Sequence, residues 1–199
     1  MVATLYSDLL RDARNTKYKY GDEQLRDWFR DKALETSKTP TNFIKEAGER
    51  SEARAGPGRM LFYNYDPKHK ATLPYYDRFP LIFKLSEDAT HFLGINLHYL
   101  PPIYRARLLD MLYDTLNNKK FDSTTKLKIN YQILNAASKF SYFRPCIKKY
   151  LKSHVRSRMV EIHPKEWDYV AFLPLARFEK SRQRDVWTES VDMIMKGRR

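Results

Sequence analysis

The sequence predicts an α+β fold, namely a small antiparallel SH3-like β-barrel with a three-helix insertion and an N-terminal helical arm. Aromatic and branched residues dominate several short runs between positions 60 and 99, and turn residues bound these runs. Between positions 101 and 156 the apolar residues instead recur mostly at helical spacing. A polar stretch that ends in Gly-Pro-Gly at position 58 separates the arm from the rest. A generic α+β sandwich is the competing architecture.

Residues 1–58 are expected to form the helical arm and a linker. Two short helices fit residues 3–15 and 22–37, and Asp22 is the expected N-cap of the second. A weaker helix is expected at 42–47, and the linker at 49–58. Because isolated helices shorter than about 12–15 residues are marginally stable in water, we expect this arm to pack on a neighbouring subunit.

Residues 59–199 are expected to form the barrel domain. Four strands are predicted from the aromatic and branched runs, and a short polar loop at 86–90 joins the second and third strands as a hairpin. The four strands are predicted at residues 60–65, 79–85, 92–99 and 158–162. A short helix is predicted from His163, a last edge strand at 172–178 and a final helix at 185–196.

Three inserted basic helices are expected at about residues 101–156. They are predicted at residues 101–117, about 125–139 and about 145–156. Ser123 or Thr124 is the expected cap of the second helix, and Pro145 occupies the favoured first position of the third. The third helix would bury an apolar stripe and leave its lysines and Arg156 facing water.

Residues 119–160 carry +10 of the net charge of +13, with eleven lysines and arginines against one acid, Asp122. Such a localised charge attracts an anionic partner, whereas a face that serves only solubility normally mixes both signs. A solvated helix face without a partner is the alternative. The sequence leaves open whether the partner is nucleic acid, an acidic protein surface or anionic lipid. The residues expected to contact it are Lys126, Lys128, Lys148, Lys149, Lys152, Arg156 and Arg158.

The aromatic residues of the strand region indicate a second kind of contact. They are more numerous than one small barrel is expected to bury, and tyrosine is enriched in the centres of protein interfaces. We therefore predict a subunit that makes several protein contacts. The expected interface aromatics are Tyr63, Tyr65, Tyr75, Tyr76 and Tyr99.

The sequence gives weak support for catalysis. It contains neither a Gly-x-x-x-x-Gly-Lys-Ser/Thr nor a Gly-x-Gly-x-x-Gly motif, and no two histidines are spaced i, i+4 on a helix. Four carboxylates near strand ends fit a Mg²⁺-dependent nuclease only weakly, and local turn roles explain them better. These carboxylates are Asp66, Asp77, Glu87 and Asp88. His98 is expected to be a hydrogen-bonded core or barrel-mouth residue, and Cys146 an inert thiol.

These observations predict a non-enzymatic protein with no cofactor, metal or small-molecule substrate. No stretch approaches eighteen uncharged apolar residues, so we expect no membrane span. The N-terminal residues also lack the continuous apolar core of a signal peptide.

Several stretches carry a family resemblance. These are residues 58–68, 73–83 and 92–102, then 150–158 (YLKSHVRSR), followed by Glu-Trp-Asp at 166–168 and Phe-Leu-Pro at 172–174. Together they make residues 58–190 similar to a conserved virion-assembly or structural protein of large contractile-tailed (myovirus-type) phages, including cyanophages.

This resemblance implies a structural subunit of a phage virion, in the tail or baseplate, that contacts other virion proteins. Its location would be the virion, and the host cytoplasm during assembly. DNA is a further expected partner through the basic helices. The alternative function is a DNA-binding protein that acts in packaging or end protection.

Overall fold

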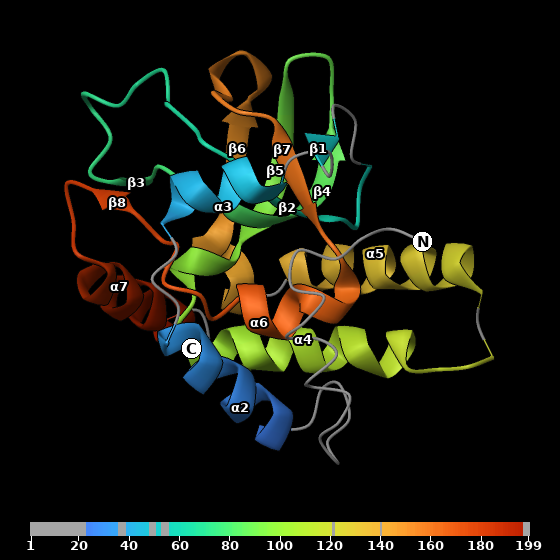
Figure 1. Cartoon of the computed structure of the whole chain (residues 1–199). Coiled ribbons are helices and arrows are strands. Elements are labelled where there is room, and N and C mark those ends of the chain that lie inside the picture. The colour runs from blue at the N-terminus through green and yellow to red at the C-terminus, as the bar shows by residue number, and fades with distance from the viewer. Residues whose placement is uncertain are drawn as a thin grey trace.

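The computed structural model describes residues 23–35, 39–47, 51–52, 56–120, 122–139 and 141–196. The helix predicted at 3–15 and the Asp22 cap lie outside these residues. Within them, the chain forms one six-stranded and one two-stranded antiparallel sheet, together with a layer of helices (Figure 1). The predicted α+β class is therefore confirmed. No helix of the described part is both long and apolar enough to cross a bilayer.

The larger sheet has the strand order β1-β7-β2-β4-β5-β6. Its strands are β1 (Ser51–Glu52), β2 (Met60–Phe62), β4 (Leu81–Glu87), β5 (His91–Asn96), β6 (Ile147–Leu151) and β7 (Met159–Ile162). The four predicted strands correspond to β2, β4, β5 and β7, and the predicted hairpin is the β4–β5 pair. The second sheet pairs β3 (Tyr76–Asp77) with β8 (Phe178–Glu179). Of the edge strand predicted at 172–178, only Phe178 is in a strand.

The larger sheet curls without closing into a barrel. The rings of Tyr65 and Tyr150 lie 5.0 Å apart, although β4 and β5 separate β2 from β6 in the sheet. Tyr65 also forms an isolated bridge with Val155, and its hydroxyl accepts a hydrogen bond from the Leu151 amide. Among the described residues no pairing joins β6 to β7, so the expected SH3-like barrel is not confirmed.

The curl gives the sheet two apolar clusters. An aromatic cluster fills the concave face and comprises Leu61, Tyr63, Tyr65, Ile82, Phe92 and Tyr150. The main core lies on the other face, where alternate strand residues such as Met60, Phe62 and Phe83 meet the helices. The helices are α2 (Glu23–Leu34), α3 (Pro40–Ala47), α4 (Pro102–Leu116), α5 (Ser123–Lys139), α6 (Trp167–Val170) and α7 (Gln183–Lys196).

Helices α2 and α3 belong to this main core. Phe29 packs against Tyr169 with ring centroids 5.9 Å apart, and Phe43 packs against Phe62 at 5.1 Å. Both phenylalanines are buried. The prediction that the arm packs on a neighbouring subunit is therefore wrong for these two helices, because their apolar stripes are already covered by the chain itself.

The insertion contains two of the three predicted helices. α4 and α5 are present, but the prediction of a third helix at about 145–156 is wrong. This part of the chain forms the end of the 3₁₀ turn η3 (Ser141–Cys146), strand β6 and the 3₁₀ turn η4 (Lys152–His154). β6 pairs with β5 from Ile95↔Ile147 to His91↔Leu151. The cap of α5 also differs from the prediction, because the Asp122 carboxylate accepts hydrogen bonds from the amides of Thr124 and Thr125 at 2.8 and 2.9 Å.

The middle of β5 leaves no space for a side chain at Gly94. A Cβ atom there would lie 2.6 Å from Ile82 Cδ1 and 3.2 Å from the Phe83 carbonyl oxygen. We predict that Gly94→Ala lowers the free energy of unfolding by about 1–3 kcal/mol through overpacking. Urea denaturation measures this loss. Gly56→Ala is the control, since nothing lies within 4 Å of a Cβ atom at Gly56; equal stability of both variants would contradict the prediction.

Candidate nucleic-acid interface

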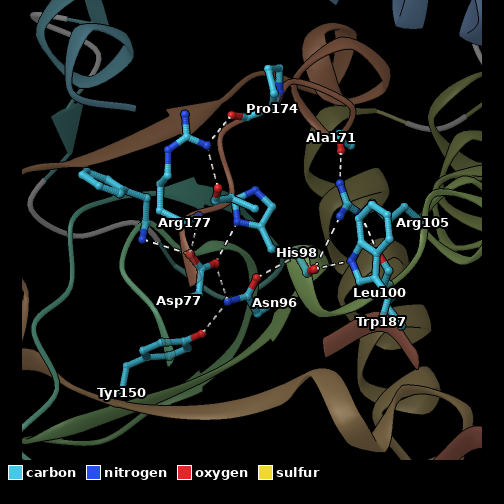
Figure 2. Close-up of polar contacts among 12 residues, drawn as sticks. Asp77, Asn96, His98, Leu100, Arg105, Tyr150, Ala171, Pro174, Arg177 and Trp187 are labelled. Atoms are coloured by element: carbon cyan, nitrogen blue, oxygen red, sulfur yellow. Dashed lines mark hydrogen bonds and ion pairs between the residues drawn. The ribbon is translucent and has the colours of Figure 1, made fainter. Parts of the chain in front are cut away.

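A buried polar network joins the two sheets. Asp77, at the end of β3, is 3% exposed, and His98, in the 3₁₀ turn η2 (Leu97–Tyr99), is completely buried. Figure 2 shows their side chains in contact, with 2.7 Å between Asp77 Oδ2 and His98 Nδ1. Asn96 Nδ2 also donates to Asp77 Oδ2 at 3.1 Å, and the Phe79 amide donates to Oδ1 at 3.0 Å. The prediction of a hydrogen-bonded core histidine is confirmed.

Asn96, the last residue of β5, is the N-cap of the 3₁₀ turn η2. Its side-chain oxygen accepts a hydrogen bond from the His98 amide at 2.9 Å, and its Nδ2 also donates to the Tyr150 hydroxyl at 3.1 Å. The His98 Nε2 atom is buried and has no hydrogen-bond partner in the described part of the chain. The side chains of Asp77 and His98 are thus buried, and the polar partners described for them belong to the protein interior.

Arg105 on α4 extends the network into the helical layer. Its guanidinium donates to the carbonyl oxygens of Leu100 and Ala171, both at 2.7 Å, and to that of His98 at 3.4 Å. It also lies 5.4 Å from the ring centroid of Trp187, whose indole N–H donates to the same His98 oxygen at 2.9 Å (Figure 2). Burial lowers the pKa of Arg105 to about 10, so the group remains cationic at neutral pH.

The four carboxylates that the nuclease interpretation considered have separate partners, and those of Asp77 are the network residues described above. Asp66 accepts a hydrogen bond from Lys70, and Glu87 accepts one from the buried Lys84. Asp88 accepts from the Thr90 and His91 amides, which lower its pKa to about 2. In the described residues no group of three or more His, Cys, Asp or Glu side chains is placed to hold a metal ion. Local contacts therefore account for Asp88, whereas Asp77 belongs to the buried network and Asp66 and Glu87 also lie near the distant cations Arg156 and Lys152.

Cys146 is buried in the main core. Its thiol donates a hydrogen bond to the Phe143 carbonyl oxygen at 2.8 Å. Burial raises the pKa of this thiol to about 12, so it is uncharged at neutral pH. This environment is typical of the inert cysteine that the sequence predicts.

The structure distributes the predicted anion-contacting cations between two regions. Lys126 and Lys128 lie on α5, in the helical layer, whereas the other five lie on β6 and on the connection from β6 to β7 (Figure 1). Those five are Lys148, Lys149, Lys152, Arg156 and Arg158. The expectation that Lys148, Lys149 and Lys152 share the wet face of one helix is wrong, because the first two belong to a strand.

Most cations of the β6–β7 region already have partners. Lys148 Nζ lies 4.1 Å from the ring centroid of Tyr99, and burial lowers the pKa of this lysine. Lys152 Nζ is 3.3 Å from Glu87 and donates to the Asp88 carbonyl oxygen. Arg156 lies 3.7 Å from Asp66. Arg158 is exposed and has a partner of its own, which leaves Lys149 as the exposed, unpaired lysine of this region within the described chain.

Helix α5 has a different charge environment. It contains three lysines and no acidic residue, and the chain has no acid between Asp122 and Glu161. Lys128 and Lys139 are exposed and form no ion pair with any residue that the structure describes. Lys119 and Lys120, in the turn before the helix, are exposed too. This helix therefore carries positive charge that the fold leaves uncompensated.

Three of the five predicted interface aromatics are interior residues. Tyr63, Tyr65 and Tyr99 are 0%, 6% and 5% exposed, because the curled sheet and the β3–β8 region bury them. Tyr75 and Tyr76 are half-buried, and the Tyr75 hydroxyl donates to Glu189 at 2.8 Å. The aromatic surplus thus forms an additional interior, and the expectation of an exposed tyrosine surface is wrong for these three.

The sequence interpretation missed Asn96 and Arg105. Alternation along residues 92–99 already placed Asn96 on one face with His98, which signalled a polar pair on a strand otherwise suited to a core. Arg105 lies four residues before Leu109 and seven before Leu112. This spacing places it on the buried stripe of α4, and an arginine there requires buried acceptors.

The chain was compared with protein families, with curated proteins and with solved structures. A family model described as the phage T4 terminal DNA protecting protein matches residues 14–191. No curated protein and no solved structure gives a significant match. The resemblance to a phage protein is therefore confirmed. The expectation of a tail or baseplate subunit is wrong, because the matched family is a DNA-end-protecting one; the alternative of end protection agrees with it.

We predict that Asp77→Ala lowers the free energy of unfolding by about 3–5 kcal/mol, because it leaves His98 and Asn96 without their buried acceptor. Chemical denaturation measures the loss, and Asp77→Asn, which keeps the side-chain volume, should lose less. Asp185→Ala is the control, since it removes a carboxylate from the exposed pair with Arg182. Equal losses for Asp77→Ala and Asp185→Ala would show that the buried network has no special weight.

Proposed function

Because this chain belongs to the phage T4 terminal DNA protecting protein family, we propose that it binds the ends of linear double-stranded DNA and shields them from degradation. The observation that carries this proposal is the family match, which spans residues 14–191 of 199. It thus includes every strand and helix described above, apart from the last residues of α7.

The charge distribution supports a DNA partner. Duplex DNA is a dense polyanion, and most of the affinity of a sequence-independent binder comes from lysines and arginines that replace its counterions. The net charge of +13 is concentrated in a part of the chain without acidic residues from 123 to 160. Such a protein can bind DNA ends of any sequence, as end protection requires.

This role needs binding and no bond-breaking step. A protein bound at a terminus blocks an exonuclease by occupying the place where the nuclease must start. The buried Asp77–His98 pair accordingly acts as a brace in this proposal, and exposed cations of the acid-free segment 123–160 make the functional surface. We propose a non-enzymatic protein on these grounds.

We further propose that the protein acts both in the virion and in the host cytoplasm, since a DNA end needs protection wherever nucleases reach it. Contacts with other virion proteins would follow from the first location.

We also propose that the larger sheet is an open variant of the SH3-like barrel. Two features support this: the order β7-β2-β4-β5-β6, and the short 3₁₀ connection from β6 that brings Val155 to Tyr65. α4 and α5 would then be an insertion between two neighbouring strands of that sheet.

An exonuclease assay tests the proposed function. Linear duplex DNA is incubated with the protein and then digested by a processive exonuclease that starts at duplex ends. We expect the lifetime of full-length DNA to rise with protein concentration and to saturate at a fixed number of proteins per end, whatever the length of the DNA. Digestion of the same DNA by an endonuclease is the control. Equal protection from both enzymes would indicate general coating, and absence of protection from the exonuclease would refute the proposal.

A further inference from the structure

We propose that α5 is the element that contacts the DNA, and that its ligand is the phosphate backbone of the duplex. The contact surface is the outer row of α5, defined as Lys128, Gln132, Asn135 and Lys139. This inference rests on the proposed function, which names DNA without saying which surface of the protein meets it.

The packing of α5 fixes the direction of this row. Its four residues are spaced by four, three and four positions, so they follow one another along one face of the helix, and all four are exposed. The buried residues Asn130, Leu134 and Ala137 lie on the opposite face. Gly58, which has a φ of +84°, lets the chain pass close to Leu127 of α5, with 3.2 Å between Leu127 Cδ1 and a Cβ atom built at the glycine. The row is therefore held outward by contacts on the other side of the helix.

The chemistry of the row fits phosphate oxygens. Lysine, glutamine and asparagine all donate hydrogen bonds, and these side chains are among the usual phosphate contacts of DNA-binding proteins. At a rise of about 1.5 Å per residue, Lys128 and Lys139 lie roughly 16 Å apart along the helix axis. This exceeds the major-groove width of about 12 Å, so the two lysines can reach phosphates on both sides of a groove.

Charge compensation distinguishes α5 from the β6–β7 region. Lys152 and Arg156 lie within ion-pair distance of Glu87 and Asp66, so a phosphate there would compete with carboxylates already in place. Lys128 and Lys139 have no such competitor within the described residues, and α5 contains no acid. The acid nearest in sequence, Asp122, is held at the N-terminus of α5 by the Thr124 and Thr125 amides.

The composition of the row argues against a protein as its occupant. Protein interfaces are usually anchored by tryptophan, tyrosine or arginine, whereas the row contains no aromatic residue and no arginine. An acidic protein surface shares the negative charge of DNA, and binding of an acidic polypeptide distinguishes the two.

The test uses the double variant Lys128→Gln/Lys139→Gln in the full chain, with Lys68→Gln/Lys165→Gln as the matched control. The control removes the same charge from two exposed lysines outside α5 that also form no ion pair with described residues. Fluorescence anisotropy measures binding to a short blunt duplex over a range of salt concentrations. We expect the α5 variant to bind more weakly and its slope of log affinity against log salt to become less negative by about 1.8, because each phosphate that a lysine neutralises contributes about −0.9 to this slope. The control should retain nearly the wild-type slope.

Each other result overturns a defined statement. If the wild type fails to bind the duplex, the proposed function is wrong. If the wild type binds and the α5 variant keeps its slope, or if the control loses as much, α5 is not the contact. If polyglutamate of matched charge binds as tightly as the duplex and depends equally on Lys128 and Lys139, the row recognises an acidic protein. Unchanged urea denaturation of both variants establishes that the comparison concerns binding alone, because all four side chains are exposed.

Discussion

The burial of one carboxylate against one imidazole holds the parts of this protein together. Burying a charge is costly unless it is paired and hydrogen-bonded, and Asp77 is surrounded by His98, Asn96 and backbone amides that fulfil this condition. β3 and β8 have only two residues each, and a strand pair so short has little stability of its own. Because the His98 carbonyl oxygen also accepts hydrogen bonds from Arg105 and Trp187, the same residue connects the small sheet, the large sheet, α4 and α7.

The positive charge of the chain has different uses in different places. Arg105 is an interior brace between backbone carbonyls, Lys148 covers an aromatic ring, and Lys152 and Arg156 lie beside carboxylates. Only a structure can separate these uses, because all of these residues count equally toward the net charge. Lys128 and Lys139 of α5 differ from these residues in being exposed, on one face of a helix and without an ion pair to any described residue. A net charge therefore indicates an anionic partner without indicating the surface that meets it.

The sequence predicted those elements whose signal is local. α4, α5 and α7 have helical spacing over fourteen or more residues, and the β4–β5 hairpin has aromatic runs around a polar turn. β6 was mistaken for a helix because Ile147, Tyr150, Leu151, His154 and Val155 recur at helical spacing. The strand form of β6 depends instead on pairing with the distant β5. The buried polar network was predicted only in part, because its residues are distant in the sequence. His98 was recognised as a core residue, but its partner Asp77 lies 21 positions earlier, and no local pattern joins two residues so far apart.

The helical insertion also sets the order in which the sheet can form. Three residues, 88–90, separate β4 from β5, whereas β5 and β6 are equally close neighbours in the sheet with 50 residues, 97–146, between them. Closing the longer connection costs about 2.5 kcal/mol more chain entropy, and non-local pairings of this kind slow folding. We therefore expect the β4–β5 hairpin to assemble early, and β6 to pair with β5 after α4 and α5 have shortened the distance between these two strands. The arrival of β6 then completes the concave face, since Tyr150 brings the ring that meets Tyr63, Tyr65 and Phe92.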